Sequence, residues 1–256
     1  MYCLGRQRDS SIPTVFGVPV LSNLHVDEPH ASSAASRLNQ LRAGVLGAND
    51  GIVSVAGIVV GVAAANTDRE AILTAGLAGL AAGALSMAVG EYVSVSTQRD
   101  TELALLEKER HELRDSPAAE LAELAAIYRA KGLSDETASQ VALELTDHNA
   151  FLAHAQAELH IDPNSLTRPW SAALWSALSF LAGAMLPLTA VLLPATSHRI
   201  PVTMLAVTVA LILTGLISAT LGHAHRGTAV LRVTVGGLAA MAVTYAIGTL
   251  VGHALT

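Results

Sequence analysis

The sequence predicts an all-α membrane protein with five transmembrane helices and a three-helix insert between the second and the third. Of its 256 residues, 52% are hydrophobic and 14% charged, and the mean hydropathy of +0.47 is too high for a soluble domain of this size. Several apolar stretches are long enough to cross a bilayer as a helix, which takes about 20 residues. The acidic residues gather in one segment, residues 96–168, which holds fourteen of the twenty-one Asp and Glu.

The charge and the cysteine content limit the function. Residues 96–168 hold only seven of the fifteen Lys and Arg, so their local net charge is −7. This charge favours a cationic ligand and argues against a nucleic-acid partner. Cys3 is the single cysteine, so the chain can form neither an internal disulfide framework nor a thiolate metal cluster. Any metal site must therefore use oxygen or imidazole ligands.

Residues 1–36 are predicted to form a flexible N-terminal tail. They contain Pro13, Pro19 and Pro29 among scattered charges and a Ser/Ala run. They also lack the uninterrupted apolar core of a secretory signal.

Residues 37–95 contain the first two spans, and the first covers about residues 43–66. Asp50 lies in its first third, where a charged residue costs about 2.5–3.5 kcal/mol on insertion scales, so it should face protein or water. Small residues on or near the same helical face let another backbone approach closely. These are Gly47, Ser54, Gly57 and Gly61. The alternative is that Asp50 is an interfacial cap or a buried partner of Arg42.

The second span, residues 71–95, has Glu91 as its single charged residue and continues into a charged helix without a break signal. A short turn before it makes the two spans an antiparallel hairpin. Counted from the end that both spans share, Asp50 and Met87 lie at matching depth, and Glu91 lies one turn nearer the water. The three side chains can therefore line one ion path, although a membrane methionine is more often a packing residue.

The insert, residues 96–168, should form three helices, of which the first is the extension of the second span. Ser116-Pro117 ends this long helix and begins the next one, because Ser is a good cap and Pro fits the first helical position. Gly132 then ends the second helix. Ser134 caps a third, which should reach about His160.

Two pairs of glutamates flank the turn at Pro117. Glu109 and Glu112 are three residues apart on the long helix, and residues at this spacing share a helical face. Glu120 and Glu123 repeat the spacing on the next helix. A helical hairpin can bring the two pairs together, as in the carboxylate metal sites of helical bundles. The four carboxylates would repel one another unless a multivalent cation lay between them.

The third helix of the insert can complete this metal site. His154 and Glu158 are four residues apart and so lie on one helical face. The alternative is a solvated acidic surface. Against it, Leu113, Leu121 and Leu124 already supply an apolar stripe for packing, and the paired glutamate spacing recurs.

Residues 169–256 contain three further spans, at about residues 170–194, 201–222 and 229–252. Five spans place the two termini on opposite sides. More arginines flank the membrane on the side of the insert than on the other, so the positive-inside rule predicts that the N-terminus and the insert are cytoplasmic. The two sets are Arg37, Arg42, Arg99, Arg168, Arg226 and Arg232 against Arg69 and Arg199.

With these features, the chain resembles the vacuolar iron transporter family, which includes nodulin-like and yeast vacuolar manganese/iron carriers, and it looks like a bacterial-type member that carries the insert. The resemblance covers about residues 37–253. It rests on the paired glutamates and on three segments: Leu41–Gly51 (LRAGVLGANDG), Ser86–Ser94 (SMAVGEYVS) and Ile127–Leu133 (IYRAKGL).

The resemblance implies a homodimer whose translocation path lies between the subunits and is lined by Asp50 and Met87. It also implies that the insert binds several divalent ions through glutamates, which here are Glu109, Glu112, Glu120, Glu123 and Glu158. Plant relatives carry methionines just before the last of these, whereas this chain has His154 and Ala155. This harder ligand set puts a strict preference for iron over manganese or zinc in doubt.

We therefore expect a proton-coupled Fe²⁺/Mn²⁺ transporter, and not an enzyme, that exports metal from the cytoplasm across a bacterial plasma membrane. Zn²⁺ and Co²⁺ are further candidate ions. Asp50 or Glu91 can bind either a proton or a metal ion and would supply the coupling. The alternative is a membrane-anchored ferritin-like di-iron oxidase or iron store, but such a protein would not need Asp50 and Met87 at matching depth. A carrier for an organic solute would leave the acidic insert unexplained.

Overall fold

The structure is a computed structural model that describes residues 14–15, 18–19, 31–222 and 224–255. The predicted flexible tail, residues 1–36, lies largely outside the described residues. Its described parts are a short antiparallel pair, β1 (Thr14–Val15) and β2 (Val18–Pro19), and the start of α1 (Ala31–Ala65). The first helix therefore begins inside the segment predicted as tail.

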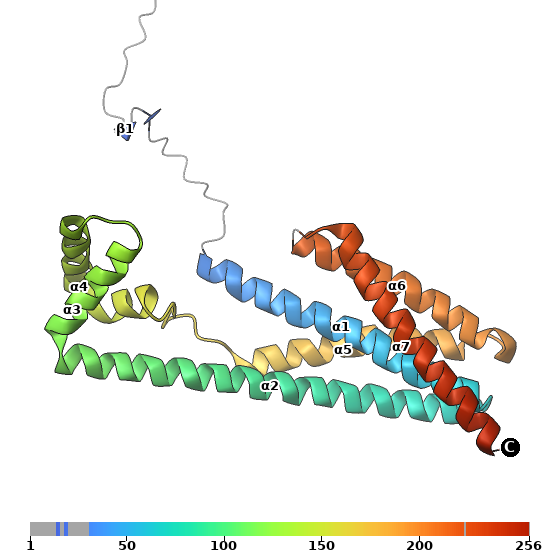
Figure 1. Cartoon of the computed structure of the whole chain (residues 1–256). Coiled ribbons are helices and arrows are strands. Elements are labelled where there is room, and N and C mark those ends of the chain that lie inside the picture. Colours follow the sequence, from blue (N-terminus) through green and yellow to red (C-terminus); the bar gives the residue numbers. More distant parts are fainter. Residues whose placement is uncertain (1–13, 16–17, 20–30, 223, 256) are drawn as a thin grey trace, which may run out of the picture.

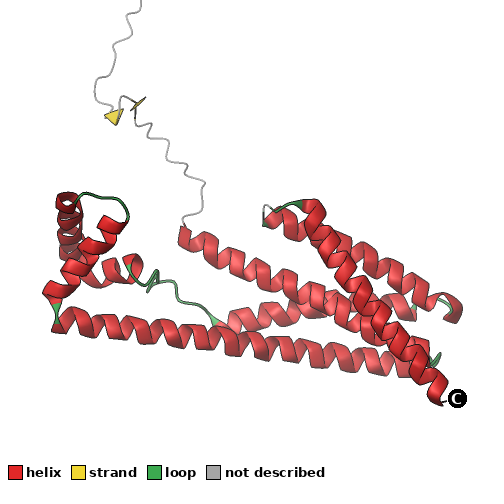
Figure 2. Cartoon of the chain, viewed as in Figure 1, coloured by secondary structure: helices red, strands yellow, loops and turns green. Residues whose placement is uncertain are grey.

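Among the described residues, five helices are long and apolar enough to cross a membrane, as the sequence predicts. They are α1, whose apolar part is Ala43–Ala65, α2 (Arg69–Asp115), α5 (Pro169–Leu192), α6 (Arg199–Leu221) and α7 (Arg226–Leu255). α1 packs against each of the other four and lies inside the bundle (Figure 1). Figure 2 shows that helices make up nearly all of the described chain.

Small residues allow α1 to approach its neighbours closely. A Cβ atom at Gly51 would collide with the carbonyl oxygen of Phe180 on α5, and one at Gly183 of α5 would collide with the carbonyl oxygen of Ala48. Farther along α1, the glycine at position 61 faces the backbone of α7. The small-residue face predicted for the first span is thus an interface, and α5 and α7 share it.

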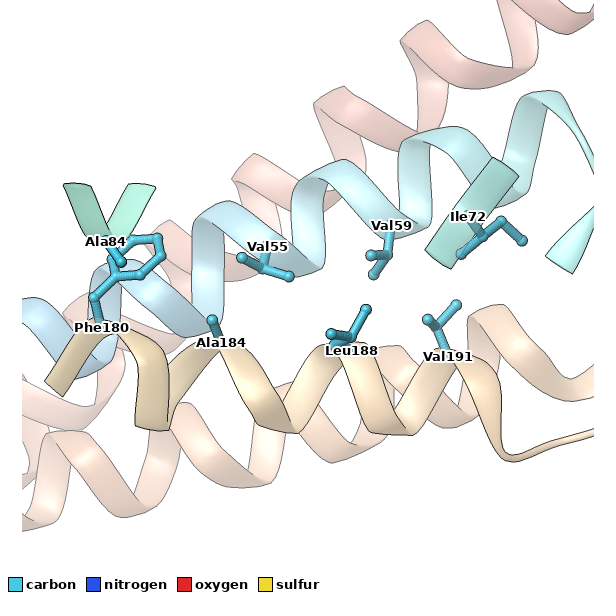
Figure 3. Packing of buried hydrophobic residues seen from close by; sticks show 8 residues of the cluster. All are labelled: Val55, Val59, Ile72, Ala84, Phe180, Ala184, Leu188 and Val191. Carbon is cyan, nitrogen blue, oxygen red and sulfur yellow. The ribbon is translucent and has the colours of Figure 1, made fainter. Parts of the chain in front are cut away.

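The core between α1, α2 and α5 consists of aliphatic side chains and one aromatic ring, that of Phe180 (Figure 3). Phe180 is 1% exposed and lies beside Ala84 of α2. Val55 and Val59 of α1 belong to the same buried cluster. Met87 packs against this cluster from α2. The first, second and third spans are therefore held together on the side of α1 that faces α5.

The turn between α1 and α2 is fixed by a helix cap and by a buried arginine. Asp68 caps α2, because its carboxylate accepts from the backbone N–H groups of Glu70 and Ala71. Arg199, at the start of α6, donates from Nη1 to the carbonyl oxygen of Thr67 at 2.8 Å. A buried arginine thus joins the loop of the first hairpin to the fourth span. The short helix η1 (Thr196–His198) leads into α6.

The three helices predicted for the insert are present. α2 continues without interruption to Asp115, α3 (Pro117–Ala130) starts with proline at its first position, and α4 (Asp135–Ala157) follows Ser134, whose hydroxyl accepts from Thr137 N–H. Gly132 takes φ = +102°, a left-handed conformation that favours glycine and ends α3. α3 packs on α4 around Leu124, and α2 contacts both.

The predicted third helix is present, but it contains a break that was not predicted. α4 is broken at Asn149, whose φ and ψ of −166° and 91° are not helical. The side-chain Oδ1 of Asn149 accepts from Leu152 N–H at 2.9 Å and so starts a second segment, residues 150–157. Figure 1 shows α4 changing direction after its first part. The regular helix ends at Ala157, three residues before the predicted end.

An aromatic pair links α2 and α5 at the end of the spans nearest the insert. The ring centroids of Tyr92 and Trp170 are 4.7 Å apart, and Trp170 is 76% exposed. Amphipathic aromatic rings are typical of the boundary between bilayer and water. The pair is consistent with α2 leaving the apolar region near Val95, where its sequence becomes charged.

Candidate metal centre

Four side chains from three helices of the insert converge on one point. Each of the four, Glu109 of α2, Glu120 of α3, His154 of α4 and Glu158 just after α4, offers one ligand atom, and these atoms all lie within 4.8 Å of one another. We refer to them as the four-residue cluster. Its centre is His154, whose Nδ1 lies 3.0 Å from Glu109 Oε1, 3.6 Å from Glu120 Oε2 and 3.5 Å from Glu158 Oε2.

The cluster is buried, although it consists of ionisable groups. His154 is fully buried, Glu109 is 2% exposed and Glu120 is 7% exposed. Within the described part of the chain, Glu109 Oε1, Glu158 Oε2 and both ring nitrogens of His154 lie away from solvent without making a hydrogen bond. Unpaired buried polar atoms are costly, and here the two carboxylate oxygens lie beside Nδ1 of His154. A divalent cation among them would satisfy these three atoms.

Without a bound metal ion, the three carboxylates of the cluster do not readily all carry a negative charge. Burial raises the pKa of Glu109, and the carboxylate of Glu158 raises it further, while His154 opposes the rise. Burial likewise raises the pKa of Glu120, with Glu123 as the next cause. Both carboxyls therefore hold their protons more tightly than an exposed glutamate would, unless another positive charge is bound.

The donor set fits a divalent transition metal of intermediate hardness. Carboxylates suit Mn²⁺ and Mg²⁺, and imidazole suits Zn²⁺, Fe²⁺ and related ions. Three carboxylates and one imidazole projecting inward from helices also resemble the carboxylate sites of helical bundles. The cluster therefore has the ligands and the burial of a metal centre.

The other two predicted ligands lie at the edge of the cluster. Glu112 is partly exposed and its Oε2 accepts from Lys108 Nζ at 2.8 Å, which is the main cause of the raised pKa of Lys108. Glu123 is exposed on α3. Both act on the cluster through their charge, since Glu112 and Glu123 raise the pKa of Glu120. The structure thus brings one glutamate of each predicted pair into the centre.

Two neighbours of the cluster were not anticipated from the sequence. Lys108 lies close enough to Glu109, Glu112 and Glu158 for their charges to act on it. The guanidinium of Arg110 lies 4.3 Å above the ring of Phe151, which joins α2 to the second segment of α4. The break at Asn149 was also missed, although Asp147, His148 and Asn149 are all weak helix formers and could have indicated it.

The residues predicted to line an ion path lie in the spans, away from the cluster. Asp50 is partly buried and accepts a hydrogen bond from Ser54 Oγ at 2.8 Å. Met87 and Glu91 are partly buried on α2. Among the described residues, neither Asp50 nor Glu91 belongs to a group of three or more His, Cys, Asp or Glu side chains that could hold a metal ion.

Known proteins resemble this chain over nearly its whole length. The model of the VIT family matches residues 41–249. A vacuolar iron transporter of Acanthamoeba castellanii is 41% identical over 226 residues, which are 88% of this chain and 84% of that protein. Vacuolar iron transporter homolog 1 of Oryza sativa subsp. japonica is 39% identical over 218 residues (85% and 76%), and homolog 2 of Arabidopsis thaliana is 34% identical over 233 residues (90% and 94%).

These relatives are transporters and not enzymes, in agreement with the sequence-based expectation. The matched region reaches all five apolar helices and contains the four-residue cluster together with Asp50, Met87 and Glu91. On this evidence the chain belongs to the VIT family.

Proposed function

We propose that the protein is a proton-coupled transporter that exports Fe²⁺ or Mn²⁺ from the cytoplasm. The observation that carries the proposal is the buried four-residue cluster on an insert that continues directly from a membrane span. The names of the relatives, vacuolar iron transporters and their homologs, support metal as the cargo. Because the relatives are transporters, we set aside the di-iron oxidase alternative.

The insert collects the metal on the cytoplasmic side. The positive-inside rule supports this orientation, since most of the arginines that flank the spans lie on the side of the insert. The affinity of a mixed carboxylate and imidazole site rises from Mn²⁺ through Fe²⁺ to Co²⁺, so the ion that is carried depends on the metals available in the cell as well as on the ligands. The charge of −7 over residues 96–168 concentrates such cations near the spans.

The path through the bilayer uses Asp50, Met87 and Glu91. An acidic residue inside a span is costly and is a marker of ion paths and proton relays. Among the described residues, the carboxylate of Asp50 accepts a hydrogen bond from Ser54 Oγ and from no other group. Its remaining lone pairs are therefore available to bind a cation. Met87 adds a thioether on the opposing span, a ligand suited to softer divalent ions.

A second copy of the chain completes the path. In α2 and α7 only 17% and 11% of the most apolar window is buried within one chain, so most of their apolar surface is free to contact lipid or a partner. Pairing two copies along the free face of α2 would bring the two Met87 residues, and with them the two Asp50 residues of α1, toward one axis. This arrangement supplies the several ligands that one chain lacks in its spans.

The coupling follows from ligand chemistry. A carboxylate must lose its proton to bind a metal ion, so the entry of a metal ion at Asp50 or Glu91 releases a proton, and its exit allows a proton to return. Export against a concentration gradient is then driven by protons moving from the receiving compartment into the cytoplasm.

Metal uptake by proteoliposomes tests the proposal. With the full-length protein and an indicator for Mn²⁺ or Fe²⁺ inside, an acidic lumen should accelerate uptake, and a protonophore at clamped membrane potential should slow it. Empty liposomes under the same gradient are the control for leakage. Uptake that is indifferent to the pH gradient at fixed potential would replace the antiporter by a passive metal channel, and no uptake of either metal would refute metal transport.

A further inference from the structure

We infer that Asn149 is a positioning residue for the metal centre, because the break it makes in α4 turns His154 and Glu158 toward Glu109 and Glu120. This inference rests on the proposed metal site. It concerns a residue that lies outside the four-residue cluster and that binds no metal itself. It is carried by the helical phase of α4, by the capping hydrogen bond of Asn149 and by the docking of the second segment on α2.

The helical phase shows what the break achieves. Successive residues of a straight α-helix are rotated by about 100°. Ala138 and Ala142 are fully buried and define the inward side of the first segment of α4. In a straight helix His154 would point about 120° away from Ala142, and Glu158 about 160° away, close to the opposite side. In the structure His154 is fully buried, so the helical phase of α4 changes between Ala142 and His154.

Asn149 itself provides a second sign of this reset. In a straight helix it would point within about 20° of Ala142, into the packed interface of α4. The structure instead places Asn149 at the surface, with a backbone conformation of φ −166° and ψ 91°. The break therefore removes a polar amide from the core and brings an imidazole into it.

The side chain of Asn149 stabilises the new direction. Its Oδ1 accepts from Leu152 N–H at 2.9 Å, which is the bond of an N-cap residue to the third residue of the helix that follows. Asn and Ser are among the best N-cap residues, whereas Ala is poor at this position and favours a continuous helix. An alanine at position 149 should thus shift α4 toward the straight form.

The second segment is held against α2 at two positions that are three residues apart. The ring of Phe151 lies under the guanidinium of Arg110 at 4.3 Å, and His154 contacts Glu109 at 3.0 Å. These contacts lie two and five residues beyond Asn149 in sequence, so both depend on the direction in which the second segment leaves the break. Straightening α4 would separate His154 and Glu158 from Glu109 together.

The test compares three substitutions in the full-length protein in detergent. Asn149→Ala should weaken Mn²⁺ binding by calorimetry about 10- to 100-fold, the range for residues that orient metal ligands. Asn149→Ser, which restores a neutral N-cap, should keep close to wild-type affinity. Glu144→Ala, exposed on the first segment of the same helix and away from the break, is the matched control and should bind as the wild type does.

Two further readouts separate positioning from general stability. Hydrogen exchange without metal should show slower exchange of Phe151 N–H in Asn149→Ala and not in Asn149→Ser, while α3 stays protected, because a continuous helix gives this group the carbonyl partner that the first turn of a capped segment lacks. The visible absorption of bound Co²⁺ should change in Asn149→Ala and return in Asn149→Ser, because the imidazole ligand is displaced in the former alone.

The outcomes distinguish this inference from the proposed metal site. If the wild type binds neither Mn²⁺ nor Co²⁺, the site itself is refuted and the inference falls with it. If the wild type binds and Asn149→Ala binds equally well with an unchanged Co²⁺ spectrum, the site stands and the positioning role of Asn149 is refuted. Failure of Asn149→Ser to restore binding would also refute it, since the cap would then not be the active feature.

Discussion

His154 Nδ1 lies 3.0 Å from Glu109 Oε1, and both side chains are buried, yet neither atom makes a hydrogen bond within the described residues. The two groups come from different helices, and Glu120 and Glu158 approach the same nitrogen. Buried groups in this relationship are stabilised by a shared cation. The short distance between His154 Nδ1 and Glu109 Oε1 is therefore the clearest structural sign of a metal-binding site.

The buried glutamates of the cluster should matter for metal binding, whereas exposed glutamates on the same helix should not. Glu109→Gln combined with Glu120→Gln should weaken Mn²⁺ binding by more than about 100-fold, because it removes two ligands and not residues that merely orient them. Isothermal calorimetry on the full-length protein measures this. Glu107→Gln is the matched control, since Glu107 is exposed on the same helix and pairs with Arg110 and His111. Equal losses in both would return the glutamates to a solvated acidic surface.

Lys108 should oppose metal binding. Its ammonium group acts on Glu109, Glu112 and Glu158, and a positive charge there repels an incoming divalent ion. Lys108→Gln should therefore raise the affinity for Mn²⁺, and the gain should shrink at high salt because the group is exposed. Arg114→Gln, six residues farther along α2, is the control. A weaker affinity in Lys108→Gln would mean that the Lys108–Glu112 pair helps to form the site.

Acid should stabilise the metal-free insert. The pKa values of Glu109 and Glu120 are raised in the folded protein by burial and then by neighbouring carboxylates. Their contribution to stability is complete below the ordinary glutamate pKa of about 4.3 and is lost as the pH rises through the raised folded values. Hydrogen exchange of α3 and α4 in EDTA, corrected for the intrinsic rate, should show protection falling over this window.

The double variant Glu109→Gln and Glu120→Gln should flatten that pH profile, because neither side chain then titrates. Protection that increases with pH in the wild type would contradict the prediction. It would show that His154 keeps the two carboxylates ionised in the absence of metal.

Asp50 should be required for transport but not for folding. Its carboxylate interacts with Ser54 within its own helix, whereas the bundle is held by the glycine contacts of α1. Asp50→Asn should reduce metal uptake by proteoliposomes to near background, and any residual uptake should lose its dependence on the pH gradient. The exposed Asp100 provides the control variant Asp100→Asn. Normal uptake by Asp50→Asn would make Asp50 a structural residue.

The packing of α1 on α5 predicts a contrast between glycines. Gly51→Ala or Gly183→Ala places a methyl group against a backbone carbonyl of the partner helix and should destabilise the protein by about 1–3 kcal/mol. Gly90→Ala meets no atom within 4 Å and should be neutral or stabilising, because alanine favours the helix. Thermal unfolding in detergent measures the difference. Equal unfolding temperatures for the three variants would contradict the close α1–α5 contact.

The helix ends of the insert could be predicted because each has a local chemical signature. Pro117, Gly132 and Ser134 act within one turn of the chain, and the structure places helix ends at all three. Asn149 carries a similar signal, but in a polar stretch that is otherwise helical the signal competes with helix propagation. The packing of Phe151 and His154 on α2 decides that competition, and such long-range contacts cannot be read from local sequence.

The identity of the inner glutamates depended on tertiary structure in the same way. Residues three apart share a helical face but point about 60° apart, so the spacing could not tell whether Glu109 or Glu112 faces the centre. α4 decides this by presenting His154 to Glu109. Arg199 is a further case, because a flanking arginine in the sequence proves to be buried and bonded to Thr67.

The uninterrupted course of α2 has a mechanical consequence. The helix contains 47 residues and no proline, and the part beyond Val95 extends about 30 Å to Asp115. A change of about 10° in the tilt of α2 within the bilayer would therefore displace its far end, with the attached α3 and α4, by about 5 Å. The position of Glu109 and its partners therefore depends on the tilt of α2, and a rearrangement of the spans that tilts this helix would move the whole insert.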